Sequence, residues 1–270
     1  MWIRQMIGLR VLAVVIVLGS VLTSHADTLI DLASVNSSSY SDPQGALFNR
    51  DATHPAGTGY INSFLRIQRD DTEQGFNTNA NNQLDNKGGN FTHALALNTL
   101  ATTTISGVDY YGFILDINQV QKKNSSDPLL SLDKLQIFTT NNPSITGYNS
   151  TTAFGANADK VYDLDGASDK YIKLDSSIAG SGSGSADMSF FLKKSLFTGK
   201  TGNYLVLYSS FGAHFASNGG FEEWAALTRD PVVSGSAPLP STAAMGALLL
   251  AALGIFQWHQ NRYQTAIPAD

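Results

Sequence analysis

The chain has 270 residues, of which 43% are hydrophobic and 14% are charged, and it carries a formal net charge of −5 and no cysteine. A net acidic chain lacks the basic surface that nucleic-acid binding needs, so we expect no nucleic-acid partner. Without cysteine there is no disulfide framework. Stability must then come from a hydrophobic core, which a chain of this length can bury in a single domain.

The N-terminal segment has the pattern of a secretory signal peptide. Arg4 and Arg10 precede an apolar run over residues 11–22, and the small residues Ser24 and Ala26 follow it. A positive start, a short apolar middle and a small-x-small exit are typical of signal peptides, so we expect cleavage after Ala26. The alternative is a membrane anchor, but the run is shorter than the roughly 20 residues of a spanning helix. Losing two of the 17 basic residues, against 22 acidic ones, makes the net charge of the mature chain about −7.

Short apolar or alternating runs, separated by turn-rich segments, fill residues 27–230. Leu115 and Ile117 alternate with Asp116, for example, and such period-two alternation predicts half-buried strands. No segment sustains the 3.6-residue period of an amphipathic helix, so we predict an all-β fold, a single β-sandwich domain of jelly-roll type. The predicted strands are TLIDL, SFLRIQ, THALALNTL, TTTIS, VDYYGFILDI, LSLDKLQIFT, DKVYDL, KYIKLD, DMSFFLK, NYLVLYSSFG and FEEWAAL.

Turns and loops are indicated by their glycine and polar residues. Residues 105–108, ISGV, predict a tight hairpin in which Gly107 has a positive φ. Residues 77–90 and 179–187 have the composition of solvated loops, and residues 231–240 that of a linker.

The run DLDGASD is the first candidate for a metal site. It places Asp163, Asp165 and Asp169 around Gly166. Calcium takes several oxygen ligands from a flexible loop, and many such loops begin with D-x-D-G, so these aspartates are candidate calcium ligands. The twelfth position holds Leu174 instead of glutamate, which excludes an EF-hand. The alternative is an ordinary turn, because Asp and Gly are common turn residues.

Other candidate ligands are scattered. A second calcium candidate combines Asp116 and Asn118, on one face of a predicted strand, with Asp133 in a neighbouring run. Three histidines lie between the two ends of the chain without the spacing of zinc ligands, and we expect structural or surface roles for them. These histidines are His54, His93 and His214.

Catalytic motifs are not evident. Glu222 and Glu223 are adjacent, so on a strand they face opposite sides and cannot form a glycosidase carboxylate pair. The GSGSG run at residues 180–184 has glycine where the serine of G-x-S-x-G stands. We therefore predict a protein that is not an enzyme. The alternative is a hydrolase whose site is assembled from carboxylates far apart in the sequence.

The C-terminal segment predicts a membrane-targeting helix. Residues 243–256 are apolar throughout, and Pro238 and Pro240 lead into Ser241, a residue that often begins a helix. With its flanking residues, the helix reaches about 18 residues, the low end of the range that crosses a bilayer. A buried helix of the domain is the alternative, but it would show a polar face, which this run lacks.

The segment PLPSTAAMGALLLAALGIF, with the basic residue Arg262 after it, resembles the PEP-CTERM sorting signal of Gram-negative bacteria. That signal has a short proline motif, an apolar helix and a basic end. Here the motif is the variant PLPST, with Leu239 in the place of glutamate. The stretches FLRIQRDDTEQGFNT, VYDLDGASDKYIKLD and GFEEWAAL are also similar to PEP-CTERM proteins of unassigned function. The resemblance implies anchoring in the inner membrane, recognition by an exosortase, and delivery to the cell surface or matrix beside exopolysaccharide.

Together these features predict an exported protein of the cell envelope or extracellular matrix, associated with exopolysaccharide or biofilm. A calcium-dependent carbohydrate-binding module is the first alternative, and a secreted hydrolase is the second. The expected division is a signal peptide, a β-sandwich domain, a linker, a transmembrane sorting segment and a short tail: residues 1–26, 27–230, 231–240, 241–262 and 263–270.

Overall fold

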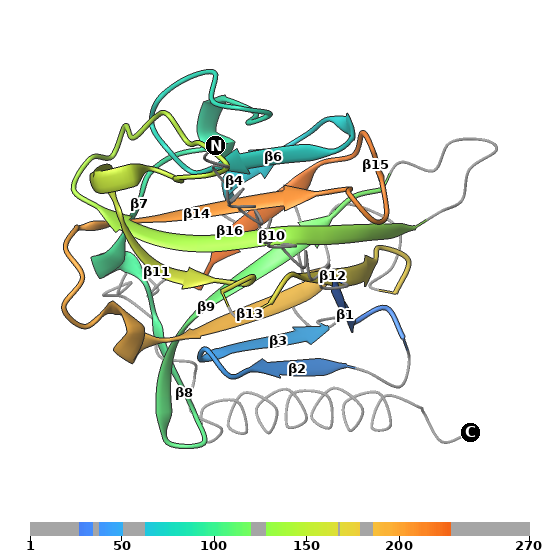
Figure 1. The fold of residues 1–270 in the computed structure, drawn as a ribbon, viewed down its shortest axis with the longest axis horizontal. Coiled ribbons are helices and arrows are strands. Elements are labelled where there is room, and N and C mark those ends of the chain that lie inside the picture. Colours follow the sequence, from blue (N-terminus) through green and yellow to red (C-terminus); the bar gives the residue numbers. More distant parts are fainter. Residues whose placement is uncertain are drawn as a thin grey trace, which may run out of the picture. The chain divides into compact units, whose positions relative to one another are not determined.

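The computed structural model describes residues 27–34, 38–50, 63–119, 128–166, 168–178 and 186–227 (Figure 1). All of them belong to one compact unit, which ends at Leu227. The expected signal peptide, linker, sorting segment and tail lie outside the described residues. Within the described residues, no helix has the length and apolarity to span a membrane. Helical structure in these residues is limited to four 3₁₀ segments: Gly89–Phe91, Leu97–Thr99, Gly155–Asn157 and Lys194–Phe197. The all-β class is therefore confirmed.

The first sheet has seven strands, and Figure 1 shows β6 (cyan) and β1 (dark blue) toward its opposite edges. Its pairings are antiparallel except for β1 with β12, which is parallel. In spatial order it contains β1 (Thr28–Asp31), β12 (Lys170–Asp175), β10 (Leu129–Thr140), β14 (Tyr204–Phe211) and β6 (Glu73–Phe76). Beside this path, β11 (Asp159–Asp163) pairs with β10, and β7 (Leu95–Ala96) pairs with β14.

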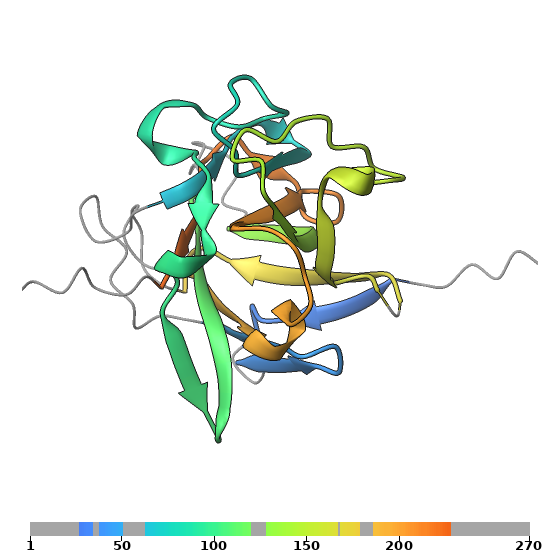
Figure 2. The same ribbon diagram turned by 90° about the vertical axis from the view of Figure 1, so that its left-hand side faces the viewer.

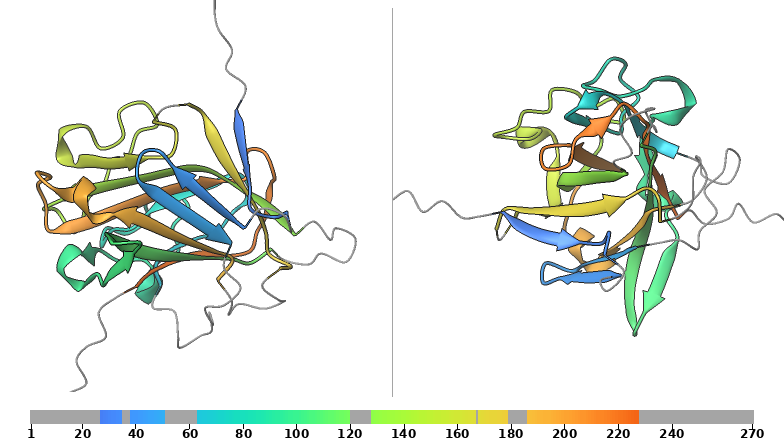
Figure 3. Two further views of the ribbon diagram at one scale, coloured as in Figure 1. Left: turned by 90° about the horizontal axis from the view of Figure 1, so that it is seen from below. Right: turned by 90° about the vertical axis from the view of Figure 1, so that its right-hand side faces the viewer.

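The second sheet also has seven strands, all paired antiparallel. Its order is β2 (Ser39–Asp42), β3 (Ala46–Arg50), β13 (Met188–Lys193), β9 (Val108–Ile117), β16 (Glu222–Ala226) and β4 (Ser63–Ile67), with β8 (Thr102–Ile105) beside β9. The β8–β9 hairpin extends well beyond its neighbours (Figure 2). Strands β2 and β3 lie toward the viewer when the domain is seen from below (Figure 3, left). A small third sheet pairs β5 (Asp70–Asp71) with β15 (Ser217–Asn218).

One hydrophobic cluster takes side chains from both large sheets. Alternate residues of β9 (Phe113, Leu115 and Ile117) lie in this cluster, as period-two geometry requires. Trp224 of β16 is fully buried, and its Nε1 donates a hydrogen bond to Ser209 Oγ of β14 (3.1 Å). The indole therefore links the two sheets through both apolar contact and a satisfied polar group.

Residues 85–87 join the two sheets at the β4–β6 edge. Asn86 forms an isolated bridge with Ile67 of β4, and its side-chain amide exchanges hydrogen bonds with the backbone of Phe76 in β6 (3.2 and 2.8 Å). The Asp85 amide donates to the Gln74 carbonyl (3.0 Å), while the Lys87 amide donates to Arg66 (2.8 Å). These bonds satisfy backbone groups of Gln74 and Phe76 in β6 and of Arg66 in β4 at this edge.

A second hydrophobic cluster lies on β6, β10 and β14 together with residues of the β10–β11 connection. Phe154 of this connection contacts Phe76 and Phe138 edge-to-face, with ring centroids 5.0 and 5.1 Å apart. Tyr148 stacks on Tyr208 at 3.7 Å and donates a hydrogen bond to Gln136 Oε1 (3.0 Å). The connection between β10 and β11 thus has a packing role of its own.

Most predicted strands are present, and the hairpin at residues 105–108 is confirmed. Ile105 pairs with Val108, and Ser106 and Gly107 both have positive φ (49° and 79°). The prediction for THALALNTL was mostly wrong, because only Leu95–Ala96 is extended and the following residues form a 3₁₀ turn. Strands β2, β3 and β6 were not predicted. Their sequences, SYSD, ALFNR and EQGF, have little β-branched or alternating character, and pairing with partner strands extends them.

Candidate functional site

The aspartates of the predicted calcium loop lie at the turn between β11 and β12. Asp163 Oδ2 accepts hydrogen bonds from Gln136 Nε2 (2.8 Å) and Lys160 Nζ (2.7 Å). Asp165 Oδ1 accepts from the Lys170 amide (3.1 Å). Burial raises the pKa of Asp165 to about 6, and that amide partly offsets the effect. Two of the predicted ligands therefore already have protein partners.

The third aspartate of that loop, Asp169, connects the loop to β1 through its backbone. Its carbonyl oxygen accepts a hydrogen bond from the Thr28 amide (2.9 Å). Within the part of the chain that the structure describes, no three Asp, Glu or His side chains gather as a metal site would need. Calcium binding at this loop stays a prediction. The second calcium candidate is divided by the fold, since Asp116 lies on β9 of the second sheet and Asp133 on β10 of the first.

His214, just after β14, is at the centre of a polar group that contacts side chains of β10 and β12 in the first sheet. Its Nδ1 lies 2.7 Å from Asp133 Oδ1, and its Nε2 lies 2.9 Å from Asp27 Oδ2. The ring also stacks on Tyr171, with centroids 3.7 Å apart and planes within 4°. A histidine whose two nitrogens both face carboxylates must donate from both, so the geometry is that of an imidazolium. Burial opposes this charge, but the two carboxylates outweigh it and raise the pKa of His214.

Ser131 lies beside this histidine but is not placed as a nucleophile. Its hydroxyl accepts hydrogen bonds from the His214 and Phe215 amides (3.0 Å each) and donates to Asp133 Oδ2 (3.1 Å). In a catalytic triad the histidine would accept the serine proton, whereas here both ring nitrogens face carboxylates. The group therefore holds the residues after β14 against β10 and the start of β1.

Of the other histidines that the sequence singled out, His93 is not part of the His214 group. His93 Nδ1 lies 3.0 Å from the Ala94 carbonyl oxygen, and His54 is outside the described residues. A structural role fits both His93 and His214. Sequence reasoning missed the partners of His214, because Asp27 and Asp133 are distant in the chain and no spacing pattern connects them.

Glu73 and Glu222 form a buried carboxyl pair between the two large sheets. Glu73 lies on β6 and Glu222 on β16, the two residues are 1% and 0% exposed, and their carboxyl groups act directly on each other. Burial raises the pKa of Glu73 and raises that of Glu222 well above the ordinary value. The prediction that Glu222 and Glu223 face opposite sides is confirmed, because Glu223 forms an ion pair with Arg66 on the other face (2.6 Å). The partner of Glu222 carried no sequence signal.

Asp187 is a further buried carboxyl group, just before β13. Its Oδ2 accepts a hydrogen bond from the Ile117 amide (2.7 Å), which continues the β13–β9 ladder through a side chain. Burial raises the pKa of Asp187 to about 8, with Asp116 and Asp175 adding to the effect. This group therefore keeps its proton to higher pH than an ordinary aspartate.

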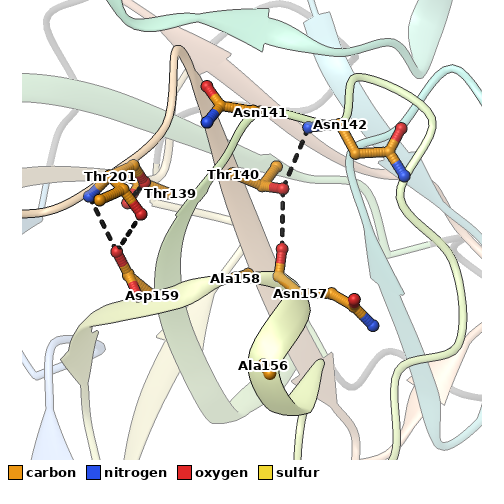
Figure 4. Close-up of a pocket in the computed structure, with 9 residues that line it drawn as sticks. All are labelled: Thr139, Thr140, Asn141, Asn142, Ala156, Asn157, Ala158, Asp159 and Thr201. Carbon is orange, nitrogen blue, oxygen red and sulfur yellow. Dashed lines mark hydrogen bonds between the residues drawn. The ribbon is translucent and has the colours of Figure 1, made fainter.

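A polar depression of about 250 Å³ lies at the end of β10 (Figure 4). Asp159 accepts hydrogen bonds from the amide and hydroxyl of Thr201 (2.8 and 2.6 Å), and the hydroxyl contact is the main cause that lowers the pKa of Asp159. Hydroxyl, amide and carboxylate groups around an open rim can exchange hydrogen bonds with a polyhydroxylated ligand. The lining consists of Thr139, Thr140, Asn141, Asn142, Ala156, Asn157, Ala158, Asp159 and Thr201.

Comparison of the chain with models of protein families, with curated proteins and with solved structures finds no match in any of the three.

Proposed function

We propose that this is an exported, non-enzymatic protein of the cell envelope or extracellular matrix, associated with exopolysaccharide. The observation that carries the proposal is the tripartite C-terminal segment, with Pro238, Pro240, Ser241 and Arg262, in a chain that begins with a signal-peptide pattern. In this proposal the helix within residues 241–262 anchors the protein in the inner membrane, and an exosortase recognises it there.

The domain between these segments is, in this proposal, a β-sandwich of jelly-roll type. Its support is the arrangement of two seven-stranded sheets that contribute to one hydrophobic cluster. Such a domain presents loops and sheet faces outside a rigid core, which suits a matrix component.

The sorting proposal is tested by expressing the full chain in a Gram-negative host with and without an exosortase. We expect membrane-bound protein without the enzyme and, with it, released protein whose intact mass lacks the C-terminal helix. The double variant Pro238→Ala/Pro240→Ala should stay in the membrane fraction. Released protein that still contains Trp258 would contradict both anchoring and cleavage.

A second candidate function, calcium-dependent carbohydrate binding, is favoured by the polar depression of Figure 4. The test applies the full chain to a glycan array with and without calcium. Asp159→Asn should weaken binding, whereas Asp109→Asn, at an exposed carboxylate on the β8–β9 hairpin, should not. An unchanged thermal midpoint on adding calcium, in both wild type and Asp163→Ala, would refute the calcium part.

A further inference from the structure

We propose that Glu73 and Glu222 form a pH-sensitive link between the two sheets. While the pair shares a proton the link holds the sheets together, and when that proton leaves, the sheets separate at the β4–β6 edge. This inference does not depend on the proposed sorting or matrix role. It concerns how the domain responds to its surroundings.

The pair joins the first sheet to the second, because Glu73 belongs to β6 and Glu222 to β16. Glu222 on β16 stands in register with Ile67 of β4 and Ile117 of β9, in the apolar interior. Glu73 reaches it from β6, where it pairs with Phe211 of β14. Residues 85–87, which join β4 to β6, lie at the same edge. A change at the pair therefore acts on the place where the sheets are joined.

A proton is the simplest occupant of this pair. Carboxylate oxygens only accept hydrogen bonds, so two carboxyl groups in hydrogen-bond contact need a proton on one of them. Among the described residues, Glu73 Oε2 accepts from the Arg69 amide (2.7 Å) and Ser217 also acts on the Glu73 carboxyl, whereas Glu73 Oε1 and both oxygens of Glu222 meet no hydrogen-bond donor. Two unprotonated carboxylates would leave these buried oxygens unsatisfied and mutually repelling.

The charged groups that act on the pair strengthen this requirement. Asp116 of β9 acts on Glu222, and Asp85, after β6, acts on Glu73, so both raise the cost of a second negative charge. Arg69, the base closest to Glu73 in sequence, directs its guanidinium to Asp85 (3.6 Å), and its side chain is 62% exposed. It is therefore a weak counter-charge for the buried pair.

The sign of the pH dependence follows from the direction of the pKa shifts. In the unfolded chain each glutamate releases its proton near the ordinary value of 4.5, whereas burial keeps the proton on the folded pair to higher pH. The stabilisation is complete below about pH 4.5 and is lost as pH rises through the raised folded value. His214, Asp165 and Asp187 also have raised pKa values and change stability in the same direction, so a test must isolate the pair.

The experiment compares denaturant unfolding of the full-length wild type and Glu222→Gln from pH 4 to pH 9. The new amide can donate to the Glu73 carboxylate, so the link is kept while its titrating proton is removed. One proton changes the unfolding equilibrium constant about tenfold per pH unit, and we expect Glu222→Gln to lose that component of the slope. The matched control is Glu223→Gln, one residue away on the opposite face, which should keep the wild-type slope.

Hydrogen exchange of the wild type gives an independent measurement. With rising pH, protection of the Asp85 and Gln74 amides should fall by more than intrinsic exchange explains, while amides near the Trp224–Ser209 link keep their protection. If Glu222→Gln does not fold, Glu73→Gln replaces it with the same expectation. A full wild-type slope in the folded glutamine variant would overturn the proposal. Calcium that restores wild-type protection at high pH, but not that of the variant, would overturn it in favour of a cation site.

Discussion

The His214 group and the Glu73–Glu222 pair both use a proton between acidic side chains, but they lie in different surroundings. His214 is partly exposed, and its charge is matched by two carboxylates. The glutamate pair is fully buried, with acidic neighbours. In water a charge costs little and salt screens its attraction, whereas in the interior an unmatched charge is costly. The same chemistry should therefore matter much more for stability at the buried pair.

The largest effect should come from breaking the buried pair. Glu222→Ala leaves Glu73 without its partner in an apolar interior and creates a cavity, so we expect a loss of about 3 kcal/mol or more in the free energy of unfolding. Urea unfolding at pH 5 measures it. Glu223→Ala, which breaks the Arg66 ion pair on the other face, should cost less, because these two side chains keep some contact with water (15% and 16% exposed). Equal losses in the two variants would contradict the difference between a fully buried carboxyl pair and a partly buried ion pair.

An intermediate effect is expected at Asp187. Its raised pKa, about 8, means that it stabilises the fold fully below the ordinary value of 3.8 and that this stabilisation is lost as pH rises to about 8. Asp187→Asn retains an oxygen for the Ile117 amide and cannot ionise. At pH 9 we expect it to be more stable than wild type by about 1 to 2 kcal/mol. Thermal unfolding across pH 5 to 9 tests this, and parallel curves for the two proteins would refute it.

The smallest effect is expected at the exposed histidine. His214→Gln removes an imidazolium whose stabilisation is complete below pH 6.5 and is lost as pH rises through the raised folded pKa. We expect a loss of at most about 1 kcal/mol at pH 6, which disappears at high pH and shrinks in concentrated salt. Salt titrations of unfolding at pH 6 measure it. A loss insensitive to salt would show that Tyr171 stacking, not charge, is responsible.

The strands that were predicted differ from those that were missed in how clearly their own sequence indicates a strand. VDYYGFILDI and LSLDKLQIFT are long, largely apolar segments that alternate in places, and each forms a long strand. EQGF has no such pattern, and it is extended because β14 pairs with it and Asn86 completes its hydrogen bonds. Leu97 follows an alternating run, yet its neighbours form a 3₁₀ turn that the Thr99 hydroxyl and the Leu100 amide stabilise.

The candidate sites follow the same division. The sequence itself determined the all-β class, the β8–β9 turn, the opposite directions of Glu222 and Glu223, and the patterns at both ends of the chain, because these depend on residues close together in the chain. Only the tertiary structure brought Glu73 to Glu222 and Asp27 and Asp133 to His214. Such contacts are set by sheet order and register, which sum many weak pairings across the whole domain, and no single residue spacing records them.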